Sequence, residues 1–155
     1  MTNVAKPLPK GLQVVTPYLC IKDAASAIEF YKKAFGATEV MRLAEPGGRI
    51  GHAEITIGGG TIMISDEYPE MGVRSPQTLG GSPVAIHLYV EDVDALASRA
   101  IAAGATAVRP VADQFYGDRA GTLADPFGHR WFIATRKENV SSAEMAKRYE
   151  AMMKP

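Results

Sequence analysis

The chain of 155 residues has one cysteine, no excess of either charge and no long apolar run. Cys20 alone cannot form an intrachain disulfide, so a reducing cytoplasm is the expected compartment. Lysine plus arginine and aspartate plus glutamate both number 17, without a basic stripe, so nucleic acid and anionic membrane surfaces are not expected partners. No stretch approaches the roughly 18 apolar residues of a membrane span, and the polar first residues contain no signal-peptide core.

What the sequence does contain is one pattern that occurs twice. Residues 15–22 alternate like a strand and end at Asp23, and a helical run then stops at Gly36. Residues 84–91 repeat this order, with Asp92 after the strand and Gly104 after the helix. Aspartate accepts hydrogen bonds from the free N–H groups of a first helical turn, and glycine suits the left-handed residue that ends a helix. The offset of roughly 69 residues is too long for a solenoid repeat and predicts two halves of one domain.

Each half reads strand, helix, strand, strand, strand, which predicts an α+β fold of two tandem βαβββ modules. We expect strands at 12–21, 38–43, 51–57 and 61–65, and again at 86–90, 106–110, 121–124 and 130–135. The apolar pattern disappears between the modules, so a mobile connector is expected there. The predicted organisation is a lead-in at 1–11, a first module at 12–66, a connector at 67–82, a second module at 83–136 and a tail at 137–155.

The tail carries the pattern of a short amphipathic helix. Ser141 and Glu144 match a capping box, in which the hydroxyl and the carboxylate satisfy reciprocal N–H groups. Met145, Tyr149 and Met152 then form an apolar stripe. Two interpretations remain open, because the stripe could pack on its own domain or on a second subunit.

A duplicated module of this order, with Asp-Pro-Phe-Gly-His at 125–129 between its last two strands, resembles the vicinal oxygen chelate superfamily. This superfamily includes glyoxalase I, the fosfomycin-resistance enzymes, the extradiol dioxygenases and the bleomycin-binding resistance proteins. Segments 27–37, 51–54, 62–67 and 116–119 resemble its PhnB-like branch. The resemblance implies that each module curls into a concave mixed sheet, that two modules face each other across a cleft, and that the protein is a homodimer.

The resemblance also marks where metal-dependent members hold their ion, at one position on the first strand and one on the last strand of each half. Here the first-strand positions are Thr16 and Ala85, and the last-strand positions are Phe132 and Ile64, or Met63 if the register slips by one. Alanine, isoleucine and phenylalanine cannot ligate, and a lone threonine is a poor ligand for zinc or nickel. We therefore expect no metal and no other cofactor in the cleft.

His52 and Glu54 are the first polar candidates for a site. They lie two residues apart on a predicted strand, so they share one face. A histidine beside a carboxylate could act as a general base, or the pair could supply two metal ligands. The alternative is a histidine bonded within the sheet, with Glu54 in solvent.

His87 is the corresponding candidate in the second half. It lies two residues after Ala85 and therefore on the face of that lost ligand position, with Tyr89 beyond it. The counterparts in the first half are Thr16 and Tyr18. His87, Tyr89, Thr16 and Tyr18 are predicted to contact a ligand in the cleft. The alternative for His87 is a histidine whose hydrogen bonds are satisfied within the sheet.

The segment 116–119 adds two further candidates. Arg119 could hold an anionic or carbonyl group and Tyr116 could stack on a planar ligand, whereas the alternative is a surface turn of Asp118 and Arg119. Phe132 makes its part of the cleft apolar. His129 lies in the last turn and is expected to be solvated.

Functions from different classes fit these observations. The first is a metal-free cleft that binds a small planar or aromatic molecule. The alternative is a glyoxalase-type enzyme, namely a lyase, a transferase or a dioxygenase, whose rearranged site uses His52 or His87 as a base or metal ligand. A third interpretation is a non-catalytic dimeric paralogue.

Overall fold

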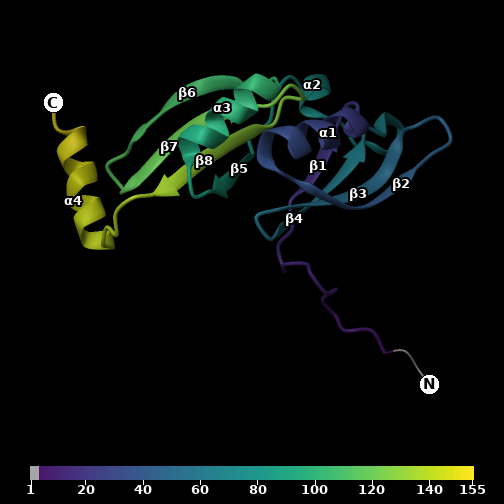
Figure 1. The fold of residues 1–155 in the computed structure, drawn as a ribbon, viewed down its shortest axis with the longest axis horizontal. Coiled ribbons are helices and arrows are strands. Elements are labelled where there is room, and N and C mark those ends of the chain that lie inside the picture. Colours follow the sequence, from purple (N-terminus) through teal and green to yellow (C-terminus); the bar gives the residue numbers. More distant parts are fainter. Residues whose placement is uncertain (1–3) are drawn as a thin grey trace. The chain divides into compact units, whose positions relative to one another are not determined.

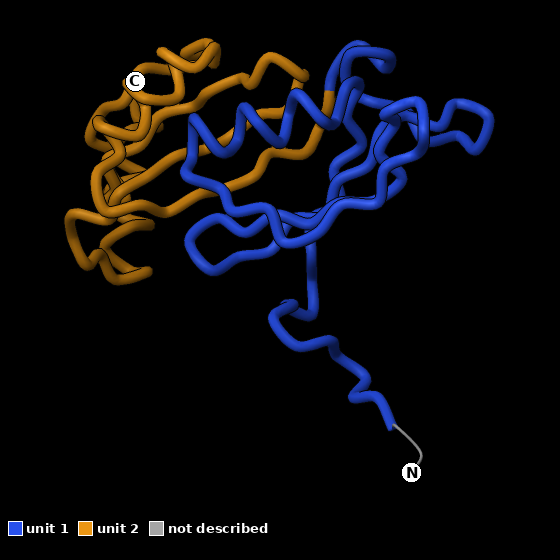
Figure 2. The backbone as a smooth tube through the Cα atoms, turned by 45° about the vertical axis from the view of Figure 1, so that its right-hand side comes forward, with its two compact units in different colours: residues 1–81 blue, residues 82–155 orange. Residues whose placement is uncertain are grey.

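The structure is a computed structural model that describes residues 4–155 (Figure 1). The chain divides into two compact units, of which the first ends at Gly81 and the second begins at Ser82 (Figure 2). No helix within residues 4–155 has both the length and the apolar character to cross a membrane.

Unit 1 is a four-stranded mixed sheet with one long helix. The strand order is β1-β4-β3-β2, and β1 pairs in parallel with β4 while the other pairs are antiparallel. Its elements are β1 (Tyr18–Ile21), α1 (Ala24–Phe35), β2 (Thr38–Ala44), β3 (Ile50–Ile57), β4 (Gly60–Asp66), the 3₁₀ helix η1 (Pro69–Met71) and α2 (Pro76–Leu79).

Unit 2 repeats this topology with the order β5-β8-β7-β6, again with a parallel first pair. Tyr18 pairs with Met63 in unit 1 as His87 pairs with Phe132 in unit 2, so the offset between equivalent residues is the same on both strands. The predicted α+β fold of two βαβββ modules and a final helix is confirmed. The elements are β5 (Ala85–Tyr89), α3 (Val93–Ala103), β6 (Thr106–Asp113), β7 (Asp118–Ala124), β8 (Arg130–Arg136) and α4 (Ser142–Met153).

The long helices begin and end at the predicted residues. The Asp23 carboxylate accepts from the Ser26 N–H at 3.3 Å, and the Asp92 carboxylate accepts from the Ala95 N–H at 3.0 Å. Gly36 follows α1 with φ of 67°, a left-handed conformation that glycine adopts without steric cost. These capping contacts confirm the helix boundaries read from the repeated pattern.

One buried side chain in each unit ties its last strand to its long helix. In unit 1 the Asp66 carboxylate accepts from the backbone N–H groups of Ala24, at 2.9 Å, and of Ile50, at 2.6 Å. In unit 2 the Thr135 hydroxyl accepts from the Val93 N–H at 2.9 Å. A carboxylate in unit 1 and a hydroxyl in unit 2 therefore accept from the first N–H of the long helix at equivalent positions.

Several strand boundaries differ from those predicted. β1 begins at Tyr18 rather than at residue 12, because Pro17 lacks the N–H that a longer ladder would need. β6 continues past Pro110 to Asp113, since it is an edge strand whose pairing tolerates register shifts around Arg109. β7 begins at Asp118, three residues earlier than predicted.

The cores lie between each long helix and one face of its sheet. Ile28 and Tyr31 of α1 are fully buried, as is Ile64 of β4, and in unit 2 Trp131 and Ile133 are fully buried on β8. Each such side chain contributes roughly 1.5–3 kcal/mol of transfer free energy. Because strand side chains alternate, the residues between them lie on the other face, which we call the open face of each sheet.

Candidate functional site

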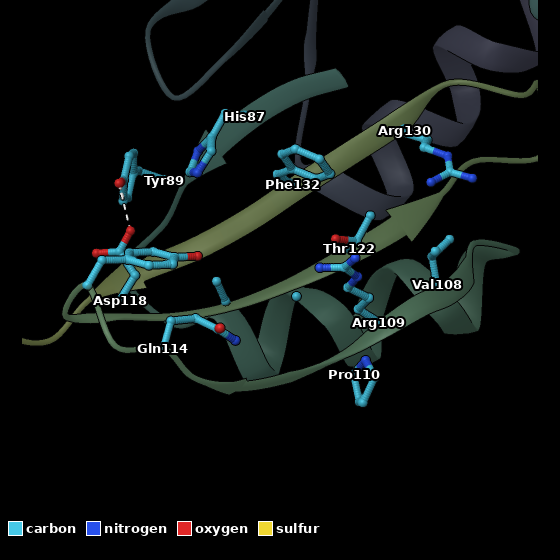
Figure 3. Close-up of a pocket in the computed structure, with 13 residues that line it drawn as sticks. His87, Tyr89, Val108, Arg109, Pro110, Gln114, Asp118, Thr122, Arg130 and Phe132 are labelled. Carbon is cyan, nitrogen blue, oxygen red and sulfur yellow. Dashed lines mark hydrogen bonds between the residues drawn. The ribbon is translucent and has the colours of Figure 1, made fainter. Parts of the chain in front are cut away.

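The open face of unit 2 carries a pocket of about 370 Å³ (Figure 3). Its floor is one row of residues in register across all four strands, namely His87, Phe132, Thr122 and Arg109. Rows on either side supply Arg130 in one direction and Tyr89 in the other. A cavity of this size accommodates a small organic molecule.

Aromatic rings form the wall of the pocket along β5 and β8. The rings of His87 and Tyr89 lie 4.6 Å apart between centroids, and His87 meets Phe132 edge to face at 6.4 Å. Phe132 is 43% exposed and Tyr89 is 60% exposed, which is a large apolar area to leave in water. This wall could cover a planar ligand.

One end of the pocket is acidic. The Tyr89 hydroxyl donates to the Asp118 carboxylate at 2.7 Å, and Asp118 is buried (Figure 3). This hydrogen bond, with a smaller effect of burial, raises the pKa of Tyr89. Burial and the charge of Asp118 also raise the pKa of Tyr116. Both phenols therefore remain protonated around the carboxylate at neutral pH.

Two arginines supply positive charge away from the acidic end, Arg109 in the central row and Arg130 in the row beyond it. Arg130 lies two residues before Phe132 on β8, and Arg109 lies on β6 beside Thr122 (Figure 3). Within residues 4–155 neither guanidinium makes a hydrogen bond or an ion pair, whereas Arg119 pairs with both Asp94 and Asp113. Their donors are therefore available to a ligand.

The open face of unit 1 carries a different arrangement, a chain of three polar side chains. The Tyr18 hydroxyl lies 2.7 Å from Nδ1 of His52, and Nε2 of His52 lies 3.2 Å from the Glu54 carboxylate. With the imidazole proton on Nε2, the ring donates to Glu54 and accepts from the phenol. Tyr18 is 52% exposed, so this phenol is both accessible and bonded to a base.

The structure divides the nine residues predicted to bind a ligand between the two units. His87, Tyr89, Tyr116 and Phe132 line the pocket of unit 2. Tyr18, His52 and Glu54 form the chain on unit 1, and the Thr16 hydroxyl donates to the Gln13 carbonyl just before β1, at 3.0 Å.

One sequence-based interpretation, that of His129, needs correction, whereas the role of Arg119 in ligand binding stays a prediction. Arg119 is absent from the residues that line the pocket with Phe132 and Tyr89; its guanidinium instead holds Asp94 of α3 at 2.7 Å. His129 is buried rather than solvated, because the Asp125 carboxylate accepts from its N–H at 3.0 Å and folds the turn inward.

Sequence reasoning missed Arg109, Arg130, Asp118 and Gln114. Strand alternation would have found Arg130, which lies two residues before Phe132. Arg109 could not be found in this way, because register shifts on either side of it break the alternation of β6.

The positions that the resemblance marks for a metal do not fit one. Ile64 is fully buried against the helix side, so the last-strand position on the open face of unit 1 is Met63. The four positions are thus Thr16, Met63, Ala85 and Phe132, none of which is a ligand for a catalytic divalent ion. Within the described part of the chain, no three His, Cys, Asp or Glu residues cluster in a way that could hold a metal ion.

Comparisons with known proteins agree with this fold. The chain is 48% identical over 134 residues to an uncharacterised protein of Mycobacterium bovis, covering 84% of this chain and 88% of the relative. Among solved structures it is similar to TioX from Micromonospora sp. ML1, with 25% identity and a TM-score of 0.62 over 83% of this chain and 100% of that one.

A second solved structure, the fosfomycin resistance protein FosX from Listeria monocytogenes in complex with Mn(II) and sulfate, shares the fold at 21% identity. It has a TM-score of 0.63 over 88% of this chain and 97% of that one. A family profile, Glyoxalase/Bleomycin resistance protein/Dioxygenase superfamily, matches residues 11–133. With that match over most of its length, the chain belongs to the Glyoxalase/Bleomycin resistance protein/Dioxygenase superfamily.

Proposed function

We propose that this protein binds a small planar molecule in the pocket of unit 2 and does so without a metal ion. The observation that carries the proposal is the aromatic wall of His87, Tyr89 and Phe132 beside a cavity of about 370 Å³. Ligand sites of this kind combine an apolar wall with a few polar groups that fix orientation. Here Asp118 and Arg109 are such groups.

The metal-free part of the proposal rests on the residues at the family's ligand positions. Thr16, Met63, Ala85 and Phe132 offer one weak oxygen and one thioether between them. Protein purified without chelator is expected to contain much less than one equivalent of zinc, nickel or manganese by elemental analysis. A near-stoichiometric metal content would refute this part of the proposal.

Binding can be tested with a fragment set that contains neutral, cationic and anionic planar compounds. Titration of isotope-labelled full-length protein is expected to shift the amide resonances of β5, β7 and β8. Ala120→Phe places a ring on the pocket floor and should abolish the shifts, whereas Ala102→Phe on the exposed side of α3 should not. Failure of every fragment to shift these resonances would refute the proposal.

A second candidate, an enzyme that transfers protons, is favoured by the chain Tyr18–His52–Glu54. A phenol that donates to a histidine oriented by a carboxylate is arranged for general acid–base chemistry. Tyr18 and Tyr149 are similarly exposed, at 52% and 50%, so a difference in their labelling rates reports activation rather than access. An aryl sulfonyl fluoride, which labels activated phenols, should therefore modify Tyr18 faster than Tyr149. His52→Gln should remove the difference, and equal labelling of Tyr18 and Tyr149 in the unmodified protein would exclude this candidate.

We also propose a branch of the superfamily, a compartment and an oligomeric state for this protein. The segments 27–37 and 51–54 support membership of the PhnB-like branch, and the single cysteine supports a cytoplasmic location. The exposed apolar side chains of α4, Tyr149, Met152 and Met153, support a homodimer.

A further inference from the structure

We infer that the pocket of unit 2 selects a planar anion that carries a hydrogen-bond donor at the end opposite its acidic group. This inference rests on the proposed function and specifies the class of ligand. It follows from how the charges of the pocket are distributed along its strands.

The two arginines that line the pocket favour a ligand with an anionic group. Arg109 and Arg130 both line the pocket, and within residues 4–155 neither is bonded to a carboxylate. Two unneutralised guanidiniums around one cavity raise its potential, and planar guanidinium groups match carboxylate or phosphate oxygens in pairs. A neutral ligand would leave this charge without a counterpart.

The middle of the pocket calls for a flat, apolar body. Phe132 and His87 lie side by side in the central row, at right angles to each other and 6.4 Å apart between centroids. Thr122 is the neighbour of Phe132 on β7. A ring that covers Phe132 would remove its exposed face from water, which is favourable in proportion to the apolar area covered.

The Asp118 carboxylate favours a ligand group that donates a hydrogen bond. Asp118 accepts the Tyr89 hydroxyl through one carboxylate oxygen, and within the described residues its other oxygen has no hydrogen-bond partner. Asp118 makes no ion pair there either, and since no buried side-chain oxygen of the described residues lacks a partner, this oxygen is accessible and can accept from a ligand. A second acidic group at this end would be repelled.

The length of the ligand follows from the register. Arg109 is paired with Thr122, and Asp118 lies four residues before Thr122 on β7. Four strand residues span about 13 Å between Cα atoms, and the side chains at the two ends occupy part of that length. A substituted aromatic ring fits this separation.

The test compares para-hydroxybenzoate with para-hydroxybenzamide, which has the same ring and hydroxyl but no charge. Full-length protein is titrated with each, and amide shifts of β5, β7 and β8 report the dissociation constant. We expect the acid to bind about tenfold more tightly than the amide, because charge-assisted hydrogen bonds to arginine are lost in the amide. Benzoate, which lacks the donor, should bind several-fold more weakly than para-hydroxybenzoate.

Matched variants assign the effect to the pocket. Arg109→Gln and Arg130→Gln should each weaken binding of the acid about threefold and leave the amide unchanged, so that together they account for the tenfold advantage. Arg74→Gln, which changes the net charge equally but lies in unit 1, should leave both unchanged. Both pocket arginines are exposed, so neither replacement should impair folding.

Equal affinities for the acid and the amide, or an advantage of the acid that survives both arginine replacements, would overturn the inference while the proposed function stands. The same holds if uncharged fragments shift the pocket resonances and neither hydroxybenzoate compound does. If no fragment of any charge shifts them, the proposed function fails as well.

Discussion

At the scale of single residues, Asp125 shows how one carboxylate can organise a turn. It accepts hydrogen bonds from the backbone N–H of Phe127 at 2.9 Å and of His129 at 3.0 Å. It also accepts from the indole N–H of the fully buried Trp131 at 2.9 Å. Three donors therefore depend on a single side chain.

We predict that Asp125→Ala lowers the free energy of unfolding by about 3 kcal/mol, because buried donors are left without an acceptor. Asp125→Asn, which keeps one acceptor oxygen, should lose less. Trp131 is the single tryptophan, so its fluorescence during urea unfolding reports this change directly. An alanine variant as stable as the original would show that the three hydrogen bonds contribute nothing net.

Cys20 allows a second prediction at this scale. Burial, with smaller contributions from the charges of Glu67 and Asp66, raises the pKa of its thiol to about 11. Because only the thiolate reacts, alkylation by iodoacetamide near pH 8 should be roughly two orders of magnitude slower than that of an unperturbed cysteine. The same chain unfolded in guanidinium chloride provides the control, and equal rates in the two states would contradict the prediction.

At the scale of elements, the last part of unit 1 contains more regular structure than its composition suggested. Residues 67–82 were expected to be a mobile connector, yet they contain η1 and α2. The Glu67 carboxylate accepts from the Ser75 N–H at 2.6 Å. Hydrogen bonds from Ser75 and Thr78 are the main cause that lowers the pKa of Glu67 to about 2.

The sign of this shift predicts how the segment responds to acid. A lowered pKa means that Glu67 stabilises the fold above its ordinary pKa of 4.5, and that this contribution is lost as the pH falls towards 2. Glu67→Gln should cost about 1 kcal/mol at neutral pH and almost nothing near pH 2. Urea unfolding at both pH values measures the difference, and a cost that does not depend on pH would contradict it.

Helix boundaries were predictable because their signals are local. Asp23 and Asp92 cap helices through side chains that reach only three residues along the chain. The same holds for Ser141, whose hydroxyl accepts from the Glu144 N–H at 3.2 Å, as the predicted capping box requires. The Glu144 carboxylate, which the capping box would place on the Ser141 N–H, instead accepts from Arg148 at 3.1 Å. The extent of β6 was not predictable, since its irregular pairing depends on a partner strand distant in sequence.

At the scale of the whole molecule, α4 supplies the prediction. Its Tyr149 ring meets Phe115 at 5.7 Å between centroids, but no residue of the helix is buried. The apolar stripe predicted for the tail is therefore only partly covered by its own unit. We expect full-length protein to form a dimer in solution.

Light scattering coupled to size-exclusion chromatography measures this assembly. Replacing Met152 by Lys should shift the equilibrium towards the monomer, because it places charge on the uncovered part of the stripe. Lys147→Met, on the same helix, serves as the control that leaves the stripe intact. A monomer at high concentration in the unmodified protein would exclude the dimer.

The repeat made the fold predictable as a whole, because the same order of elements is written twice in the sequence. The candidate pocket was predictable only in part. Phe132 follows from the position that the family resemblance marks on the last strand, and His87 and Tyr89 follow from strand alternation relative to Ala85. Asp118 could not be found in this way, because its role depends on the Tyr89 hydroxyl, 29 positions away in the chain. Charge arrangements of this kind arise only when the strands are paired.

Because the two sheets share one register, an open-face residue of one unit has an equivalent position in the other unit. Tyr18, His52 and Glu54 correspond to His87, Ala120 and Thr122, because Tyr18 and Glu54 flank Met63 as His87 and Thr122 flank Phe132. The hydrogen-bonded trio of unit 1 therefore occupies the positions that, in unit 2, belong to three residues lining the pocket. The duplicated fold thus has a cavity on one sheet and a hydrogen-bonded polar trio at the equivalent positions of the other, so the two halves have diverged at the same structural positions.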